Sequence, residues 1–193
     1  MPNADAERWN EKYRTESALW LDMEPRYLLE VFKSQLPHEG LALDIACGVG
    51  VTANYLAALG LNVIGIDISE YALHLAICKT RKLGYPVQFA VADISNLWLP
   101  ANSFDLITNF HFLERSAIPV LKQALKPGGM ILFETFMATG RTNFASEYYL
   151  RPGELNSLFE KFSILHYAEC MHQPSQNHGE RGTAQLVARK PEE

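Results

Sequence analysis

An apolar run that ends in a carboxylate and continues into a glycine turn is the feature that most constrains this chain. Residues 41–50 read LALDIACGVG, and a second apolar run, residues 63–66, ends at Asp67, seventeen residues after Gly50. Continuous apolar runs of this length are typical of parallel strands that are buried on both faces. Because such sheets bind ligands at the carboxyl ends of their strands, Asp44 and Asp67 are predicted to face one cleft.

Strand-length apolar runs alternate with helical patterns along the rest of the chain. This order predicts an α/β fold with a Rossmann-like, doubly wound, mostly parallel sheet that has helices on both faces. The last two strands alternate in polarity, which predicts an antiparallel C-terminal hairpin joined by a polar loop. Further strands are expected at 87–91, 104–110, 130–135 (after a turn at 126–129), 163–170 and 183–189, and helices at 51–59, 69–84, 116–125 and from 154, with a buried stripe that reaches Phe162.

About forty residues precede the first strand and contain two helical pieces. Trp9 and Tyr13 lie one helical turn apart, and Pro25 stands where a first-turn proline belongs, before Leu28. The segment is too short for a second domain. We therefore expect a single domain over residues 1–193, in which residues 1–40 form a helical lid over the cleft and residues 41–193 form the Rossmann-like core.

Composition and charge narrow the class of protein. The chain has 193 residues, 48% of them hydrophobic, which is enough to bury the core of one ordinary domain. The net charge of -5 and the dispersed basic residues disfavour a nucleic acid as partner. No signal peptide is recognisable, and no stretch approaches the roughly 20 apolar residues that span a bilayer. These features predict a cytoplasmic protein without a membrane partner, as a monomer or homodimer.

The cysteines and histidines do not predict a metal site. The three cysteines are far apart and lack a C-x-x-C spacing, which disfavours both a disulfide framework and a zinc site. Cys47 is expected to be a small buried side chain in a tight loop rather than a reactive thiol. His172 and His178 share a polar loop, but no acidic or cysteine partner set accompanies them.

The glycine loop alone fits two cofactors. Gly48-x-Gly50-x-x-Ala53 satisfies the dinucleotide fingerprint, and Asp67 lies nineteen residues after Gly48, close to the roughly 20 expected for an acid that binds a ribose. Asp44 separates the two cases, because a carboxylate at this strand end would repel a pyrophosphate. S-adenosylmethionine (SAM) carries an ammonium and a sulfonium, so the sign of the charge favours SAM over NAD.

Asp67 is predicted to bind the ribose of that nucleoside. A carboxylate can accept hydrogen bonds from both ribose hydroxyls, each contributing about 1.5–3 kcal/mol. The alternative is that Asp67 caps the next helix, although Ser69 is also well placed to do so.

At this point the residues show a family resemblance. Residues 43–50 (LDIACGVG) resemble motif I of the class I SAM-dependent methyltransferases, and Asp67, Ala92-Asp93-Ile94 and Lys126-Pro127-Gly128-Gly129 fall where that family has its later motifs. The match spans about Leu41 to Thr135. Ala46 departs from the pattern, which usually has glycine there. The resemblance implies a seven-stranded sheet whose last strand is antiparallel.

The resemblance also implies roles for individual residues. The loop with Ala46, Gly48 and Gly50 would hold the methionine part, bordered by Asn109 and Phe110. Asp67 would accept from the ribose hydroxyls, and Asp93 would accept from the adenine amino group with Ile94 against the ring. Ile68 and Ala92 are further predicted cofactor contacts. More narrowly, Trp9-Asn10-Glu11-Lys12-Tyr13, Trp20 and Glu24-Pro25 are similar to the N-terminal segment of thiopurine and tellurite-resistance methyltransferases, whose aromatic residues close over SAM. Packing on the core is the alternative for Trp9 and Tyr13.

The predicted function is methyl transfer from SAM to a small-molecule acceptor, with S-adenosylhomocysteine as the second product. The narrower resemblance suggests a thiol or a chalcogen oxyanion such as tellurite or selenite, which needs no base. His111 follows the fourth strand and is the candidate base if one is required. Arg141, Tyr148 and Tyr149 are candidate substrate contacts, with ordinary surface and packing roles as the alternative. A nicotinamide-dependent oxidoreductase and a non-catalytic SAM-binding module remain the rival functions.

Overall fold

The computed structural model describes residues 4–21, 23–138, 146–171 and 182–192 and contains a seven-stranded sheet. The strand order is β3-β2-β1-β4-β5-β7-β6, and β7 is antiparallel to both of its neighbours. The predicted fold class, including the antiparallel C-terminal hairpin, is therefore confirmed. The strands are β1 (Leu41–Ile45), β2 (Asn62–Asp67), β3 (Val87–Val91), β4 (Phe104–Phe110), β5 (Leu125–Met137), β6 (Ser163–Met171) and β7 (Gly182–Arg189).

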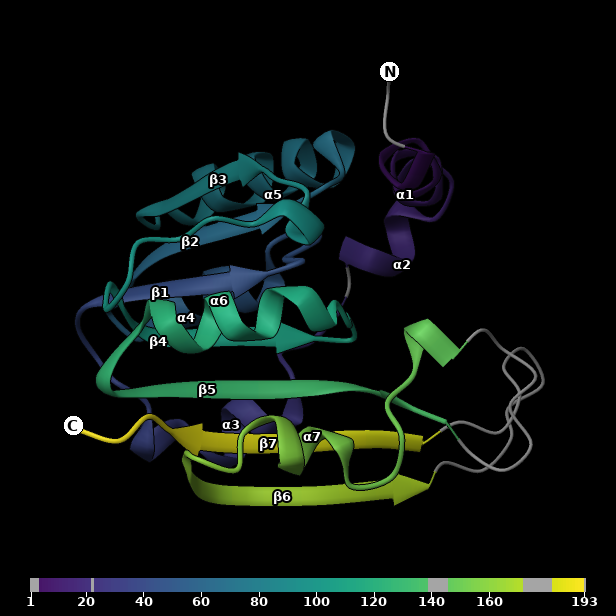
Figure 1. Ribbon diagram of the computed structural model, residues 1–193. Coiled ribbons are helices and arrows are strands. Elements are labelled where there is room, and N and C mark those ends of the chain that lie inside the picture. Colours follow the sequence, from purple (N-terminus) through teal and green to yellow (C-terminus); the bar gives the residue numbers. More distant parts are fainter. Residues whose placement is uncertain (1–3, 22, 139–145, 172–181, 193) are drawn as a thin grey trace.

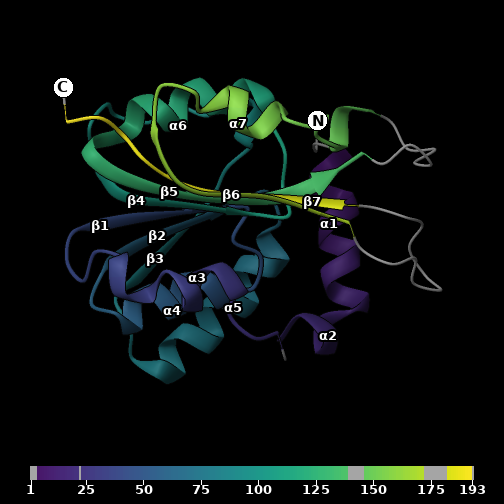
Figure 2. The ribbon, with the colours of Figure 1, turned by 90° about the horizontal axis from the view of Figure 1, so that it is seen from below.

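Helices cover both faces of this sheet (Figure 2). The helices α3 (Tyr27–Val31), α4 (Val51–Ala58) and α5 (Glu70–Leu83) lie on one face, and α6 (Ile118–Ala124) and α7 (Glu154–Leu158) on the other. The helices α1 (Ala4–Thr15) and α2 (Ser17–Leu21) lie beyond the ends toward which β1 to β5 point (Figure 1). Short 3-10 turns are η1 (Lys33–Gln35), η2 (Ile94–Asn96), η3 (Arg115–Ala117) and η4 (Ser146–Tyr148).

Successive residues of a central strand supply the two halves of the core. In β4, Leu106 packs in the cluster with the α3 and α4 side chains, whereas Ile107 packs in the cluster with α6 and α7. This alternation follows from the two-residue period of a strand. Each fully buried aliphatic side chain contributes about 1.5–3 kcal/mol relative to exposure. Both faces are therefore apolar, which explains why the strands read as continuous apolar runs.

The turn predicted before the fifth strand is wrong, because β5 already begins at Leu125. Lys190 donates to the carbonyl of Gly129 and accepts from the N–H of Gly128, so pairing with the chain end extends the strand through the glycine pair. Gly128 has a φ of 75°, which glycine adopts without strain. The helix predicted over 116–125 correspondingly ends at Ala124 and is preceded by the 3-10 turn η3.

Two further helix predictions also differ from the structure. Pro25 lies before the extended N-cap residue Arg26 rather than in the first turn of α3, and the N-terminal segment has three helices instead of two. The helix that begins at Glu154 ends at Leu158, although Phe159 and Phe162 beyond it are buried as predicted. Packing of these two rings in the core fixes the chain after Leu158, although it is no longer helical there. Of the loop predicted at 171–182, the first and last residues belong to β6 and β7, and residues 172–181 lie outside the described residues.

Candidate cofactor and acceptor site

The candidate site lies where the chain order of the sheet reverses, between β1 and β4. Ligands of open α/β sheets bind in the crevice beyond this point. Asp44 of β1 pairs in register with Thr108 of β4, and Asp67 ends the neighbouring strand β2. The predicted convergence of the two carboxylates at one end of the sheet is thus what the topology produces.

Asp44 is a buried carboxylate with one oxygen that lacks a hydrogen-bond partner in the described part of the chain. Its side chain is 2% exposed, and Oδ1 accepts a hydrogen bond from Thr108 Oγ1 at 2.7 Å. Oδ2 is buried and has no hydrogen-bond partner among the residues that the structure describes. Burial raises the pKa of Asp44 to about 7, and the Thr108 hydrogen bond opposes that rise. A buried, unsatisfied acceptor is unfavourable by about 1–3 kcal/mol, so this oxygen is suited to a cationic donor.

Asp67 connects the glycine loop to the start of α5. Its oxygens accept from the backbone N–H groups of Gly48 and Ser69, both at 2.8 Å. Ser69 is the N-cap of α5 and accepts from the N–H of Ala72 at 3.1 Å, so the alternative in which Asp67 caps this helix is wrong. Burial raises the pKa of Asp67, and its backbone hydrogen bonds oppose the rise. Each oxygen retains a second lone pair that a hydroxyl can use.

The loop between these acids follows a left-handed path. Gly48 has a φ of 53° and Gly50 a φ of 76°, and Ala46 has a φ of 51° without being glycine. A left-handed backbone is the physical reason that glycine is usual at the Ala46 position. Cys47 is buried, and burial raises the pKa of its thiol well above the usual range. That environment supports the expected packing role for Cys47 over a reactive one.

Aromatic residues of α1 and α2 lie over this loop. Tyr13 is 7% exposed and clusters with Val49 of the loop. Its ring centroid is 5.9 Å from that of Trp9 and 5.0 Å from that of Trp20. Burial, followed by the charge of Asp67, raises the pKa of the Tyr13 hydroxyl. The aromatic face of α1 therefore packs against the glycine loop, as the packing alternative predicts, and the lid role over a cofactor stays a prediction.

Asn10 attaches α1 to the core and was missed by sequence reasoning. Its Oδ1 accepts from Ser69 Oγ at 2.8 Å and from the N–H of Tyr71 at 3.0 Å. Asn10 lies in the segment that carried the N-terminal resemblance, but no local pattern indicated its partners. These bonds hold α1 beside Asp67.

Arg26 is a second residue that the sequence did not reveal. It precedes α3, and the charges of Glu134 and Asp44 both act on its guanidinium. Burial lowers the pKa of Arg26, and the two carboxylates oppose that change. This end of the sheet thus has one cation whose charge acts on a carboxylate with an oxygen left unsatisfied by the described residues. Such a pair matches a zwitterionic ligand group.

His111 forms a hydrogen-bonded pair with Glu134. Nε2 of His111 lies 2.9 Å from Oε1 of Glu134, and the other oxygen, Oε2, accepts from Gln185 Nε2 at 2.7 Å. The His111 ring stacks on Phe136, with centroids 4.9 Å apart. Sequence reasoning found His111 from its place after β4 but missed Glu134 and Gln185.

The remaining predicted cofactor contacts lie around the same strand ends. Asp93 accepts from the N–H and Oγ of Ser95 and caps η2, and Ile94 behind it is buried. Asn109 donates to the carbonyl of Phe112 at 2.8 Å, and Phe110 packs in the core cluster with Leu106. Ile68 and Ala92 are half-buried. The adenine and methionine roles of these residues stay predictions.

The candidate acceptor residues follow β5. Tyr149 lies 6.3 Å from Phe136 between ring centroids, and Tyr148 is 51% exposed. Arg141 lies outside the described residues. The two tyrosines are therefore at or near the surface on the His111 side of the site.

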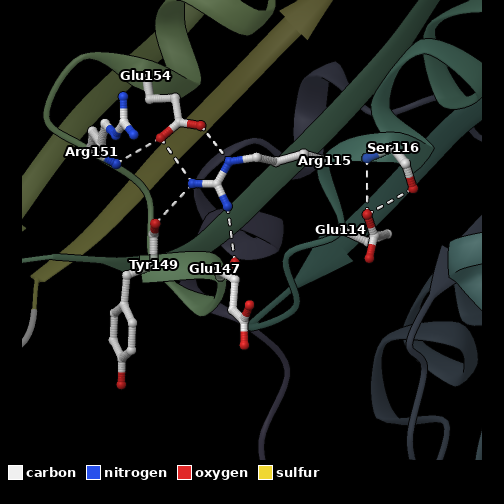
Figure 3. Close-up of polar contacts among 7 residues, drawn as sticks. All are labelled: Glu114, Arg115, Ser116, Glu147, Tyr149, Arg151 and Glu154. Carbon is white, nitrogen blue, oxygen red and sulfur yellow. Dashed lines mark hydrogen bonds and ion pairs between the residues drawn. The ribbon is translucent and has the colours of Figure 1, made fainter. Parts of the chain in front are cut away.

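Arg115 anchors the segment that carries these tyrosines (Figure 3). It donates from Nε and Nη2 to Glu154 at 2.6 and 3.0 Å, and to the backbone carbonyls of Glu147 and Tyr149, both at 2.9 Å. The Tyr149 side chain points away from the guanidinium. Arg115 thus fixes the backbone of the tyrosine segment, and the Tyr149 ring lies near Phe136. No sequence signal indicated this role.

Neither a metal cluster nor a membrane span is found in the described part of the chain. Within the described ranges, no group of three or more His, Cys, Asp or Glu side chains could hold a metal ion. His172 and His178 fall outside those ranges. Over the same ranges, no helix has the length and apolar character to cross a bilayer.

Comparison with known proteins supports the cofactor identity. The sequence profile of a methyltransferase domain matches residues 43–133. The ubiquinone biosynthesis O-methyltransferase of Dinoroseobacter shibae is 35% identical over 157 residues, covering 68% of this chain and 63% of that protein. Phosphoethanolamine N-methyltransferase 1 of Arabidopsis thaliana is 34% identical over 119 residues, which cover 58% of this chain and 24% of that protein.

The fold comparison agrees. TehB from Haemophilus influenzae has a TM-score of 0.72 and 24% identity over 84% of this chain and 61% of that one. At this identity the likeness concerns the fold alone, and the narrower resemblance to the tellurite-resistance and thiopurine branch stays a prediction. The chain spans 50% and 63% of the length of two curated ubiquinone O-methyltransferases that it matches. The profile match over residues 43–133, the fold and the two acids on the glycine loop together support a class I, S-adenosylmethionine-dependent methyltransferase domain in this part of the chain.

Proposed function

We propose that this protein transfers a methyl group from SAM to a small-molecule acceptor and releases S-adenosylhomocysteine. The observation that carries the proposal is the pair of buried carboxylates on one glycine loop. Asp67 bonds the N–H of Gly48, and Asp44 has an unsatisfied oxygen at the neighbouring strand end. A cationic nucleoside satisfies this arrangement, whereas a pyrophosphate would be repelled by it.

The charges at this end of the sheet fit the methionine group of SAM. Asp44 Oδ2 is the acceptor for the ammonium, and Arg26 supplies a cation for the carboxylate. Asp67 receives the ribose hydroxyls through its remaining lone pairs. Trp9, Tyr13 and Trp20 cover the cofactor from the lid side, and Trp20 Nε1 is a buried donor with no partner in the described chain.

The protein's own contribution to the reaction is alignment, exclusion of water and acceptance of a proton. SAM supplies a methyl group on a sulfonium, and the carbon–sulfur bond breaks with its electron pair kept by sulfur. Holding the acceptor in line contributes on the order of 7–11 kcal/mol. His111, which follows β4, is the group that takes a proton from the substrate that receives the methyl group.

The acceptor class has two indications. The resemblance of the N-terminal segment favours a thiol or a chalcogen oxyanion such as tellurite or selenite. The relatives are named O- and N-methyltransferases, so related chains differ in the acceptor atom. Tyr148, Tyr149 and Arg141 are the proposed acceptor contacts, with Phe136 beside Tyr149.

The proposal is tested by titrating the protein with SAM and with NADH in a calorimeter and by measuring S-adenosylhomocysteine release with thiols, selenite, tellurite and small phenols. We expect SAM binding and turnover with at least one acceptor. Preference for NADH would refute the assignment. Tight SAM binding with no turnover for any acceptor would favour a non-catalytic SAM-binding module instead.

A further inference from the structure

The pair of His111 and Glu134 is built from two adjacent parallel strands. Phe110 pairs in register with Glu134, and the N–H of His111 donates to the backbone carbonyl of Glu134 at 2.7 Å. The same two residues are joined again by their side chains at 2.9 Å. Backbone and side chain together therefore define where the imidazole lies.

His111 holds this position at a conformational cost. Its φ is 59°, in the left-handed region that residues with a side chain rarely adopt. Such a backbone is unfavourable and persists where the surroundings over-determine it, most often at functional sites. The stack on Phe136 and the two contacts with Glu134 are the interactions that oppose this strain.

Glu134 is held as an ionised acceptor. Its side chain is 11% exposed, and Oε2 receives the amide of Gln185 from β7. Burial raises the pKa of Glu134, but the hydrogen bonds from His111 and Gln185 and the charge of Arg26 together bring that pKa below its usual value. A carboxylate facing Nε2 accepts a hydrogen bond from that nitrogen, so the proton of the neutral ring resides on Nε2. Nδ1 then keeps the lone pair and is the only ring nitrogen able to accept a proton.

We infer that Glu134 is a positioning residue that orients His111 so that its Nδ1 accepts a proton. The substrate that receives the methyl group is then a weakly acidic hydroxyl compound such as a phenol. This inference rests on the proposed function. A thiol with an unperturbed pKa of about 8.5 is partly ionised near neutrality, and an oxyanion is already ionised. A phenol with a pKa of about 10 must lose its proton as it reacts, and the His111–Glu134 pair provides a group that can accept this proton.

The proton and electron balance is complete with groups already named. The hydroxyl proton moves to Nδ1 of His111, and the hydroxyl oxygen forms the new bond to the methyl carbon. The carbon–sulfur bond breaks toward sulfur, giving a methyl ether and S-adenosylhomocysteine. His111, which is 31% exposed, returns its proton to water.

The charged and titratable groups around the pair come from several elements. Glu134 lies on β5, Arg26 precedes α3 and acts on both Glu134 and Asp44, and His166 of β6 lies 3.5 Å from Gln185 Oε1. Of these, Glu134 is the group that contacts the His111 ring. Replacing its charge is therefore the most direct test.

The test compares Glu134→Gln and His111→Gln with the wild-type protein. Glutamine at 134 keeps the shape and a hydrogen-bond acceptor but removes the charge that stabilises the protonated ring. With a phenol, we expect kcat/KM to fall about 10–100-fold in Glu134→Gln and about 100-fold or more in His111→Gln, the range typical of general-base loss. The acidic limb of the pH profile should move to lower pH in Glu134→Gln, a change that a purely structural role would not produce.

Two controls separate the positioning role from general damage. Glu160→Gln replaces an exposed carboxylate and should leave every parameter unchanged. SAM affinity, measured by calorimetry, should stay within about twofold in all variants. Nitrogen NMR of His111 should show a proton on Nε2 in the wild-type protein without any acceptor, a readout that does not depend on turnover.

The outcomes are distinguishable from failure of the proposed function. Wild-type kcat/KM for phenols in His111→Gln, or an Nδ1–H tautomer of His111, would overturn the inference. Turnover of thiols or selenite with no turnover of any hydroxyl compound would overturn it while leaving methyl transfer intact. Absence of SAM binding would instead refute the proposed function. If Glu134→Gln does not fold, His111→Gln and the tautomer measurement still decide.

Discussion

The hydroxyl oxygen of Tyr13 lies against Gly48, so closely that a Cβ atom on Gly48 would be 2.6 Å from it. The next Tyr13 atom would be 3.4 Å away, which is ordinary contact. The Tyr13 hydroxyl oxygen is therefore the closest approach of this α1 side chain to the glycine loop at Gly48. This close approach also makes the position of Tyr13 testable by substitution of Gly48.

Gly48→Ala should displace Tyr13 and weaken SAM binding, because the new methyl group occupies the space of the Tyr13 hydroxyl. We expect at least about a tenfold loss of affinity, or roughly 1.4 kcal/mol, measured by calorimetry. Part of the loss should be recovered in the double variant Gly48→Ala/Tyr13→Phe, which removes the clashing oxygen.

The matched control is Gly84→Ala, since Gly84 has a φ of 73° and nothing within 4 Å of the added Cβ. It should lower the stability by about 1 kcal/mol through backbone strain alone and leave SAM binding unchanged. Equal affinities for Gly48→Ala and the wild-type protein would show that Tyr13 does not pack over the bound cofactor.

Asp67→Ala should weaken SAM binding about a hundredfold or more, because both ribose hydrogen bonds would be lost at roughly 1.4 kcal/mol per tenfold. The structure adds a second contribution, since Asp67 also holds the N–H groups of Gly48 and Ser69. Asp105→Ala is the control, because Asp105 bonds Leu41 and Lys126 at the opposite end of the sheet. An unchanged dissociation constant for Asp67→Ala would exclude the ribose role.

The stability of the cofactor-free protein should fall as pH rises, because of Asp44. The folded-state pKa of Asp44 is raised from 3.8 to about 7, so the folded state binds this proton more tightly than the unfolded state. The resulting stabilisation is complete below the unfolded pKa and is lost as pH rises through about 7. Between about pH 5.5 and 7 the loss is about 2 kcal/mol, at roughly 1.36 kcal/mol per pH unit. Denaturant unfolding at several pH values measures it.

Asp44→Asn should reduce this pH dependence and stabilise the cofactor-free protein near pH 8 while weakening SAM binding. The raised pKa of Asp67 acts in the same direction, so some pH dependence should remain in the variant. SAM affinity of the wild-type protein should increase as pH rises through about 7, since only ionised Asp44 attracts the ammonium. A SAM affinity that is equal for Asp44→Asn and the wild-type protein would contradict the electrostatic basis of the site.

Arg115→Lys should raise the KM for the acceptor and leave SAM affinity unchanged. Lysine cannot reproduce the bidentate contact with Glu154 and the two carbonyl contacts at once, so the segment with Tyr148 and Tyr149 loses its anchor. We expect about a tenfold increase in acceptor KM, obtained from steady-state kinetics at saturating SAM. Arg189→Lys, which alters a contact to the carbonyl of Gly128, is the matched control. A change in SAM affinity alone would refute this acceptor-side role.

Short-range signals in the sequence were sufficient to predict where several strands and helices begin and end. The strand that ends at Asp67, the Ser69 cap and the Gly84 stop are each defined by residues a few positions apart, and the structure has all three, whereas the first strand continues one residue past Asp44 to Ile45. The period of apolar residues and the preferences of caps and turns act within one element, so they can be read without knowing the fold. The negative charge of Asp44, which favoured SAM over NAD, could also be read from a single position.

Contacts between distant segments were decided only by tertiary structure. Glu134 meets His111 across 23 residues, Gln185 meets Glu134 across 51, and Asn10 meets Ser69 across 59. Arg115 reaches Glu154 across 39 residues for the same reason. No residue pattern within one element specifies such pairs, because they depend on which strands become neighbours and on the register between them. The sequence by itself determined the cofactor end of the sheet, and the sheet order determined which side chains complete the acceptor end.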